Sequence, residues 1–284
     1  MKLLRFGAPG QERPGLLDGE GRVRDLSAHV GDIGPDMLDP ASLARLAALD
    51  PQDLPLVDGQ PQQDLRLGAC VAGVGKFLAI GLNYACHAAE TGMEAPAEPV
   101  IFTKWTSSIT GPDDSLHLPH GSTAADWEVE LGVVIGTTAK NIAESEAMEH
   151  VAGFCVVNDL SERDWQLRRG GTWDKGKGHD GFGPIGPWLV TRDEIADPGN
   201  LRLWLDLDGE RMQDGSTQSM IFGVARLVAE CSRYGTLHPG DIITTGTPAG
   251  VGMGMKPPRY LQAGQEMRLG IEGLGSQCQR VIAG

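Results

Sequence analysis

The stretch DWEVELGVVIG, residues 126–136, decides how the middle of the chain folds. Its apolar, β-branched second half is typical of a buried strand. Side chains two residues apart in a strand point to the same face, so Glu128 and Glu130 bring two carboxylates together. Like charges on one face repel, and on a buried face they also lose hydration. The pair therefore belongs either to a cation site or to a solvated face of a sheet.

A third carboxylate supports the cation site. Asp159 stands where the apolar stretch VAGFCVVND, residues 151–159, ends. Three carboxylates with no cysteine nearby favour a hard ion, Mg²⁺, Mn²⁺ or Ca²⁺, over zinc. The alternative is that the two glutamates face water and that Asp159 caps a turn.

Composition limits the class of protein. The 284 residues carry a formal net charge of −14, which argues against a nucleic-acid or membrane partner but leaves anionic small molecules open. The five cysteines are scattered and lack CxxC spacing, so we expect neither a disulfide scaffold nor a zinc knuckle. There is no signal-peptide pattern and no run of 18 apolar residues. These features predict a soluble cytoplasmic protein.

The pattern along the chain predicts a β-rich α+β protein. We expect a small N-terminal α+β domain at residues 1–68, with a hairpin turn at DGEGR and a helix at 39–50 capped by Asp39. Residues 69–284 are expected to form the larger domain. Its predicted strands lie at 76–84, 99–105, 129–136, 151–159, 186–191, 201–209, 241–248 and 267–275. Its predicted helices lie at 83–90, 143–151 and 220–235.

Two pairs of polar residues stand three positions apart. On a helical turn, His87 and Glu90 share one face, and a histidine beside a carboxylate is a general-base arrangement. Arg163 and Gln166 would likewise share a face if a helix begins after Asp159, and they suit a substrate carboxylate or carbonyl. The alternatives are an exposed helix with incidental charges and a surface ion pair of Arg163 with its neighbour.

Two glycine-rich segments complete the set of candidates. GTWDKGKGHDGFGPIGP, residues 171–187, carries Lys177 but lacks the order of a P-loop. GDIITTGTPAGVG, residues 240–252, passes through Gly246 and Thr247, whose amide and hydroxyl could bind an anion. Each could equally be a flexible loop or a turn.

Taken in order, the motifs GLNY, DWEVELGVVIG, NDLSERDWQ, KGHDGFGPIGP and GDIITTGTPAGVG resemble the fumarylacetoacetate hydrolase family over residues 76–252. The resemblance implies a mixed β-sandwich roll that forms a homodimer or higher homo-oligomer. It implies Mg²⁺ held by Glu128, Glu130 and Asp159. It also implies that the catalytic residues are His87, Glu90 and Lys177. The substrate-binding residues that it implies are Arg163, Gln166, Gly246 and Thr247. In the family, the segment that carries His87 and Glu90 is a lid that orders when substrate binds. This chain departs from similar members there at Cys86, where they often have an acidic residue.

The resemblance further implies a reaction. A 2,4-dioxo acid would chelate the metal, His87 and Glu90 would deprotonate water, and attack on C4 would release a pyruvate enolate that Mg²⁺ and Lys177 stabilise. The chain is most similar to the subgroup acting on 2,4-diketo-3-deoxy sugar acids such as L-rhamnonate or L-fuconate derivatives, often described as ureidoglycolate lyases. Oxaloacetate decarboxylation, isomerisation, dehydration and ureidoglycolate cleavage remain alternatives. A non-enzymatic, metal-stabilised ligand-binding protein is the alternative outside enzymology.

Overall fold

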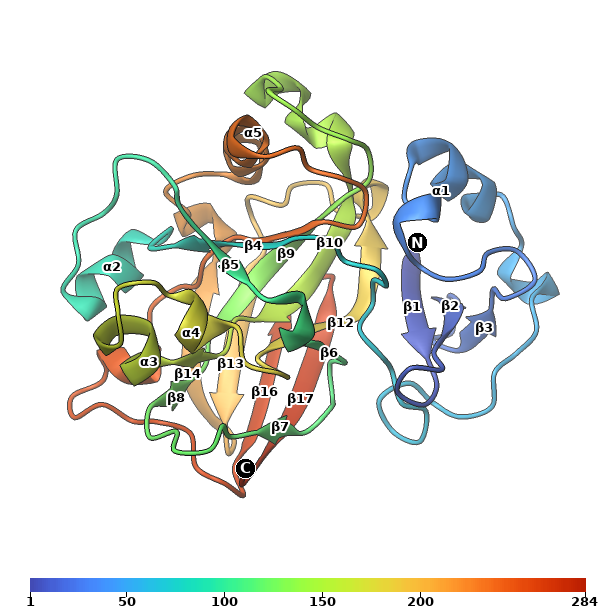
Figure 1. Ribbon diagram of the computed structural model, residues 1–284. Coiled ribbons are helices and arrows are strands. Elements are labelled where there is room, and N and C mark those ends of the chain that lie inside the picture. The colour runs from blue at the N-terminus through green and yellow to red at the C-terminus, as the bar shows by residue number, and fades with distance from the viewer.

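Two β-sheets packed face to face organise the computed structural model, which describes all of residues 1–284 (Figure 1). The ten-stranded sheet has the order β3-β2-β1-β12-β10-β9-β15-β4-β5, with β6 paired to β12. The five-stranded sheet has the order β14-β13-β16-β17-β7, and β8 and β11 form a separate pair. This mixed architecture confirms the predicted β-rich α+β class.

The elements have the following bounds. The strands are β1 Lys2–Phe6, β2 Arg13–Leu17, β3 Val23–Asp25, β4 Phe77–Gly81, β5 Val100–Lys104, β6 Ile109–Thr110, β7 Leu116–His117, β8 Ala125–Asp126, β9 Val129–Ile135, β10 Val151–Asn158, β11 Ser161–Glu162, β12 Gly183–Thr191, β13 Arg202–Leu207, β14 Glu210–Ser216, β15 Ile242–Thr244, β16 Glu266–Ile271 and β17 Gly275–Ile282. The α-helices are α1 Pro40–Ala47, α2 Ala85–Thr91, α3 Arg163–Arg168, α4 Asp174–Lys177 and α5 Val224–Tyr234. No helix is both long enough and apolar enough to cross a bilayer.

Successive side chains of strand β9 point alternately to the two faces of the large sheet, and the two faces have different surroundings. Val129, Leu131 and Val133 join the main core, which also contains apolar side chains of β13 and β16 from the five-stranded sheet. The side chains between them point the other way, as expected for a pleated strand. On that opposite face Val134 belongs to a second core, while Glu130 stands nearer the start of the strand. The carboxylates are thus on the face away from the five-stranded sheet.

The second core ties the N-terminal segment to the large sheet. Strand β1 pairs antiparallel with β12, with Leu3 opposite Leu189. Both leucines are buried with Val134 and Ile242 in one apolar cluster that also includes side chains from α1. Figure 1 shows β1–β3 and α1 together at one side of the molecule, with α2, α3 and α4 at the opposite side. The division of domains at residue 68 stays a prediction, since sheet and core both continue across it.

Several local predictions are confirmed. The segment 18–22 connects β2 and β3 as a hairpin, and the Asp39 side chain caps α1 by accepting from the amides of Ala41 and Ser42. All eight predicted strands of the larger domain are present. The segment predicted as a helix at 143–151 instead forms a 3-10 helix, Glu144–His150. Its run of charged residues leaves mainly Ala147 buried, so too little apolar surface is available to stabilise regular α-helical turns.

Candidate metal and active site

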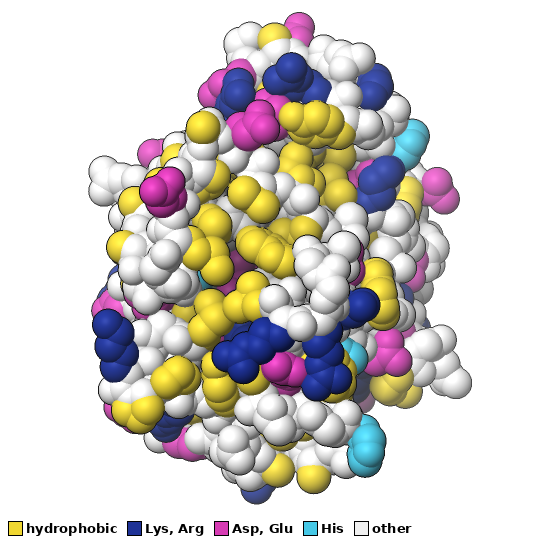
Figure 2. Space-filling view, turned by 60° about the vertical axis from the view of Figure 1, so that its left-hand side comes forward, with side chains coloured by type: hydrophobic (Ala, Val, Ile, Leu, Met, Phe, Trp, Pro, Cys, Tyr) yellow, Lys and Arg dark blue, Asp and Glu magenta, His cyan; other side chains and the backbone are white.

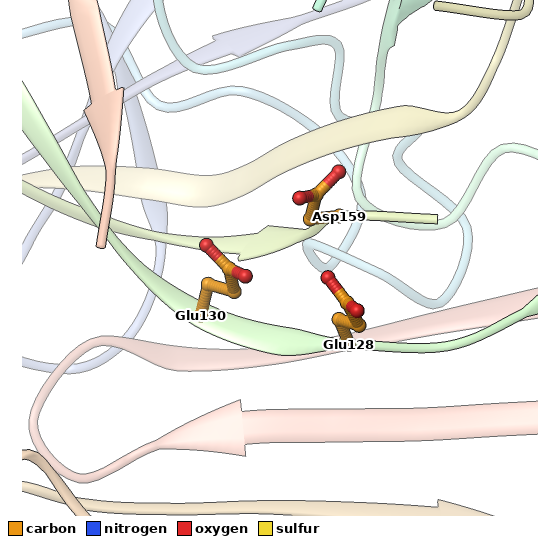
Figure 3. Close-up of side chains that lie close together, drawn as sticks. All are labelled: Glu128, Glu130 and Asp159. Atoms are coloured by element: carbon orange, nitrogen blue, oxygen red, sulfur yellow. The ribbon is translucent and has the colours of Figure 1, made fainter. Parts of the chain in front are cut away.

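Three carboxylates meet where β9 begins and its neighbour β10 ends (Figure 3). Glu128 immediately precedes β9, Glu130 lies within it, and Asp159 follows β10. Oxygen atoms of all three lie within 4.8 Å of one another, and each residue is no more than 4% exposed. The two strands hold this arrangement by pairing Asn158 with Val129, and the Asp159 amide donates to the Glu128 carbonyl at 2.9 Å. The predicted cluster therefore exists and is buried rather than solvated.

Two buried cations partly neutralise the cluster. Lys177, the last residue of α4, places Nζ 2.6 Å from Glu128 Oε2 and 2.7 Å from Asp159 Oδ2. Arg163, the first residue of α3, donates from Nη2 to Glu128 Oε1 at 2.7 Å. Its Nε donates to Asp126 Oδ2 at 2.8 Å. Both predicted basic residues are thus brought to the carboxylates, and Arg163 fixes the position of Glu128.

The two glutamates have opposite electrostatic environments. Burial raises the pKa of the Glu128 carboxyl, but its ion pairs with Lys177 and Arg163 outweigh burial and hold that pKa well below its usual range. Burial raises the pKa of Glu130, and the neighbouring charges of Asp159 and Glu128 raise it further. Glu130 accepts hydrogen bonds at Oε2 from the Gly246 amide and the Thr244 hydroxyl. It is the carboxylate with the least compensation by cations.

The arrangement fits a divalent cation. Lys104 Nζ lies 2.7 Å from Asp159 Oδ1 as an ion pair, but its hydrogen bonds go to the carbonyls of Leu160 and Lys177. Asp159 Oδ1 is compensated by the Lys104 ion pair, whereas Glu130 lies buried beside Asp159 and Glu128 with no cation paired to it. Clustered carboxylate oxygens without thiols nearby are the donors that Mg²⁺, Mn²⁺ and Ca²⁺ prefer. Glu128, Glu130 and Asp159 together could hold such an ion.

A histidine–carboxylate pair lies beside the carboxylates. His87 and Glu90 are on the short helix α2, and His87 Nδ1 is 2.9 Å from Glu90 Oε1. Glu90 also accepts from the Gly250 amide at 2.9 Å through Oε2, which connects α2 to the segment after β15. With Nδ1 held by Glu90, Nε2 is the His87 nitrogen left to contact a ligand. The predicted i, i+3 pair is present.

The remaining predicted residues have supporting contacts. Gln166 accepts from Arg163 at 3.0 Å through Oε1, so its amide nitrogen remains available as a donor. Thr247 donates from its hydroxyl to the Val129 carbonyl at 2.8 Å. Gly246 has φ +92°, and a side chain there would collide with Asn83 Cβ at 2.8 Å. The chain at Gly246 thus requires glycine in order to present its amide to Glu130.

One pocket collects these groups. The predicted site residues that line it are His87, Glu128, Glu130, Asp159, Arg163, Gln166, Lys177 and Thr247. Glu90 and Gly246 do not line the pocket. Glu90 contacts His87, and the Gly246 amide donates to Glu130. Figure 2 shows a hollow on this face with hydrophobic side chains around it and acidic groups at its base. Asp180, part of the motif that carries Lys177, is exposed and lines a different groove.

Sequence reasoning missed Lys104 and Asp126. Lys104 is fully buried at the end of β5, where one lysine closes an otherwise apolar strand-like run. Asp126 accepts from Arg163 and from the amides of Gly252 and Met253, so it connects the carboxylate cluster to a distant loop. For Lys104 the sequence signal is a single charge at the end of an apolar run, and for Asp126 it is a third carboxylate beside Glu128 and Glu130; neither identifies a partner.

Comparison with known proteins assigns the family. A profile described as fumarylacetoacetate (FAA) hydrolase C-terminal matches residues 76–282. The chain belongs to the fumarylacetoacetate hydrolase family. A relative from Burkholderia multivorans is 65% identical over 280 residues, covering 98% of both chains, and its description goes no further than a hydrolase. Membership in the fumarylacetoacetate hydrolase family confirms the resemblance found in the motifs.

The solved structures that are similar to this chain include both hydrolases and isomerases. A probable 2-hydroxyhepta-2,4-diene-1,7-dioate isomerase from Mycobacterium abscessus is 34% identical, with TM-score 0.83 over 100% of this chain and 99% of the other. Maleylpyruvate hydrolase from Sphingobium sp. SYK-6, in complex with manganese(II) and pyruvate, is 27% identical with TM-score 0.81 and covers 100% of both chains. The fold is therefore one shared with enzymes named for acting on oxo acids and their enols.

Proposed function

We propose that the protein is a Mg²⁺-dependent hydrolase that cleaves the C3–C4 bond of an acylpyruvate-type 2,4-diketo acid. The products are pyruvate and a carboxylic acid. A 2,4-diketo-3-deoxy sugar acid such as 2,4-diketo-3-deoxy-L-rhamnonate, which yields lactate, is the substrate class proposed from the motifs. The observation that carries the proposal is the His87–Glu90 pair, which shares one pocket with three buried carboxylates. The maleylpyruvate hydrolase structure with manganese and pyruvate supports it.

Glu128, Glu130 and Asp159 would hold the cation, which supplies a Lewis acid for the oxo and carboxylate oxygens of the substrate. The protein's own groups bind the substrate around it. The free amide of Gln166 lines the pocket and can donate to a substrate oxygen, while Thr247 lines the pocket with its hydroxyl already donated to the Val129 carbonyl. Arg163 is already committed to Glu128 and Asp126, so its role in this proposal is to fix the first carboxylate.

His87 and Glu90 provide the base. Glu90 makes the imidazole more basic by accepting from Nδ1, and Nε2 takes a proton from water. The resulting hydroxide adds to C4, and the C3–C4 bond breaks. Its electron pair remains on C3 and delocalises to the 2-oxo group as the enolate of pyruvate. Lys177 is a buried cation at this point and stabilises the developing negative charge. Protonation of C3 then gives pyruvate.

Pyruvate release tests the proposal directly. Purified protein with Mg²⁺ is offered a panel of acylpyruvates and 2,4-diketo-3-deoxy sugar acids, and pyruvate is followed with a coupled dehydrogenase. We expect stoichiometric pyruvate and carboxylic acid from at least one member, and loss of turnover when EDTA removes the metal. Turnover of other oxo acids without pyruvate from any of the panel would disprove the hydrolase assignment.

Isomerisation is the second candidate, and the similarity to the Mycobacterium abscessus isomerase favours it. An isomerase would need the same enolate stabilisation but no attack by water. The two reactions separate in H₂¹⁸O, because only hydrolysis places ¹⁸O in the carboxylic acid product. Oxaloacetate decarboxylation would release CO₂ together with pyruvate, and it is tested by adding oxaloacetate to the panel and following CO₂. A protein that binds oxo acids and metal but turns over none of these substrates would match the non-enzymatic alternative.

A further inference from the structure

The pocket lining also contains apolar side chains that meet the carboxylate cluster at Lys177. Phe102 of β5 and Trp173, which precedes α4, meet edge to face with ring centroids 5.1 Å apart. Met93 and Leu167 line the pocket with them. We call these four side chains the acyl wall. A methyl group added at Gly81 would overlap the indole of Trp173, so glycine at position 81 is what allows the ring to lie against strand β4.

The acyl wall is held in a fixed relation to the reacting end of the pocket. Lys177 Nζ lies over the Phe102 ring, 5.2 Å from its centroid. The Lys177 amide also donates to the Trp173 carbonyl at 3.2 Å, so one helical turn connects the two residues. A substrate whose oxo-acid end lies at Lys177 and the carboxylates therefore directs its acyl group along Phe102 toward Trp173.

The charged side chains that line the pocket belong to the carboxylate cluster and its partners, and the acyl wall contributes none. Among the lining residues, the ionisable ones are His87, Glu128, Glu130, Asp159, Arg163 and Lys177. Both cations in this set are paired with carboxylates, Arg163 with Glu128 and Lys177 with Glu128 and Asp159. The nearby Arg169 lies outside the pocket lining and is paired with Asp164. A carboxylate on the acyl group would thus lie against apolar side chains, with both lining cations already paired to protein carboxylates.

We propose that the acyl wall selects acylpyruvates whose acyl group is uncharged, and discriminates against those that carry a second carboxylate. The inference rests on the proposed cleavage of acylpyruvates and adds the class of acyl group to it. A hydroxyalkyl or alkyl group meets the requirement. Trp173 and Phe102 are then specificity-determining residues that contact the acyl group, while the chemistry takes place at the carboxylates and Lys177.

Two substrates that differ only at the last carbon test the proposal. 2,4-Dioxoheptanoate ends in a methyl group and 2,4-dioxoheptanedioate ends in a carboxylate. We expect kcat/KM for pyruvate release to be roughly 100-fold higher for the methyl compound, the size expected from leaving a carboxylate unpaired. Calorimetric titration of both compounds into the Mg²⁺-loaded protein should show the same preference in Kd. Equal affinity for the two compounds would overturn the acyl-wall proposal even if neither is cleaved, whereas absence of pyruvate alone bears on the proposed reaction.

Substitutions at Leu167 sharpen the test. Leu167 is 38% exposed, so a longer side chain can extend without entering the core. Leu167→Arg places a cation at the acyl wall and should reduce the methyl-to-carboxylate preference by about tenfold, one good charge pair. Leu167→Gln adds polarity without charge and should leave most of the preference. Leu56→Arg adds the same charge at an exposed site outside the pocket and should leave the preference intact. An unchanged preference in Leu167→Arg would contradict the proposal.

Discussion

The protein contains two buried clusters of acidic and basic side chains that differ in one respect. In the β2–β3 hairpin, Asp18 Oδ1 accepts from the amides of Glu20 and Arg22, and Oδ2 accepts from the side chains of Arg22 and Arg24. Every oxygen of that carboxylate is satisfied. In the pocket, Glu130 is buried beside the charges of Glu128 and Asp159 and has no cation paired with it.

This difference in compensation indicates that the Asp18 cluster stabilises the fold and that the pocket cluster is suited to bind a ligand. A buried carboxylate whose oxygens all accept hydrogen bonds carries no uncompensated desolvation cost, so Asp18 stabilises the hairpin. An incompletely satisfied cluster costs stability, and a ligand that completes it recovers that cost on binding. Removal of a carboxylate should therefore have opposite consequences in the two places. The predictions below test this contrast in order of expected effect.

The largest effect is expected for Glu130→Gln. Loss of this ligand should lower kcat/KM by at least about 1,000-fold, because the proposed cation no longer binds tightly. The metal-free variant should unfold at a temperature equal to or above that of the wild type, since a neutral amide ends the repulsion with Glu128 and Asp159. Differential scanning calorimetry with and without Mg²⁺ measures both changes. Glu149→Gln, an exposed change, is the control, and a normal Mg²⁺-induced rise in Tm in Glu130→Gln would place the cation elsewhere.

Asp18→Asn should do the reverse. We expect a loss of about 2–3 kcal/mol in the free energy of unfolding, because Arg24 is left buried without its carboxylate. Activity per folded molecule should stay at the wild-type level. Urea titration measures the loss, with exposed Asp58→Asn as the matched control from the same segment. A catalytic defect without a loss of stability would remove the contrast between the two clusters.

The contribution of Asp18 should also depend on pH in a defined direction. Burial raises the pKa of the Asp18 carboxyl, but hydrogen bonds from Arg22 and Arg24 outweigh burial, so its pKa in the folded state lies well below its value in the unfolded chain. The stabilisation is therefore complete above the unfolded-state pKa, about 4, and is lost as the pH falls further toward the folded-state pKa. The stability difference between wild type and Asp18→Asn should be constant above about pH 5 and shrink below pH 4.

The third effect concerns the base rather than the cation. Glu90→Gln should lower kcat by roughly 100-fold through loss of general-base catalysis, while calorimetric Mg²⁺ affinity stays at the wild-type value. Glu94→Gln provides a control, because Glu94 is exposed in the same segment of the chain. Full activity of Glu90→Gln on a substrate that is hydrolysed would exclude the general-base role.

Much of the fold was predictable because its strands are apolar runs between glycine and proline turns. Strands β14 and β17 escaped prediction, since both expose alternate polar side chains and bury glutamines such as Gln213 and Gln277. These glutamines are satisfied by partners far along the chain, Thr247 for one and the Val156 carbonyl for the other. Local hydrophobicity does not reveal contacts of that kind.

The candidate site was predictable where spacing in a strand or helix sets proximity. Glu128 and Glu130 share a strand face, and Arg163 and Gln166 share a helical turn. Lys104 depends instead on the meeting of three segments, as it contacts Asp159 and the carbonyls of Leu160 and Lys177. The acyl wall likewise arises from tertiary packing, so the pattern of residues carried no sign of it.

The shared core beneath β12 has a consequence for where the protein can be cut. The family profile matches residues 76–282, so strands β1–β3 and helix α1 lie outside the matched range. A chain trimmed to the profile would lose β1 and uncover Val134, Leu189 and Ile242 on one side of the large sheet. It would present both an unpaired strand edge and a bare apolar face to solvent. Variation in the N-terminal segment is tolerable only so long as something still covers that face.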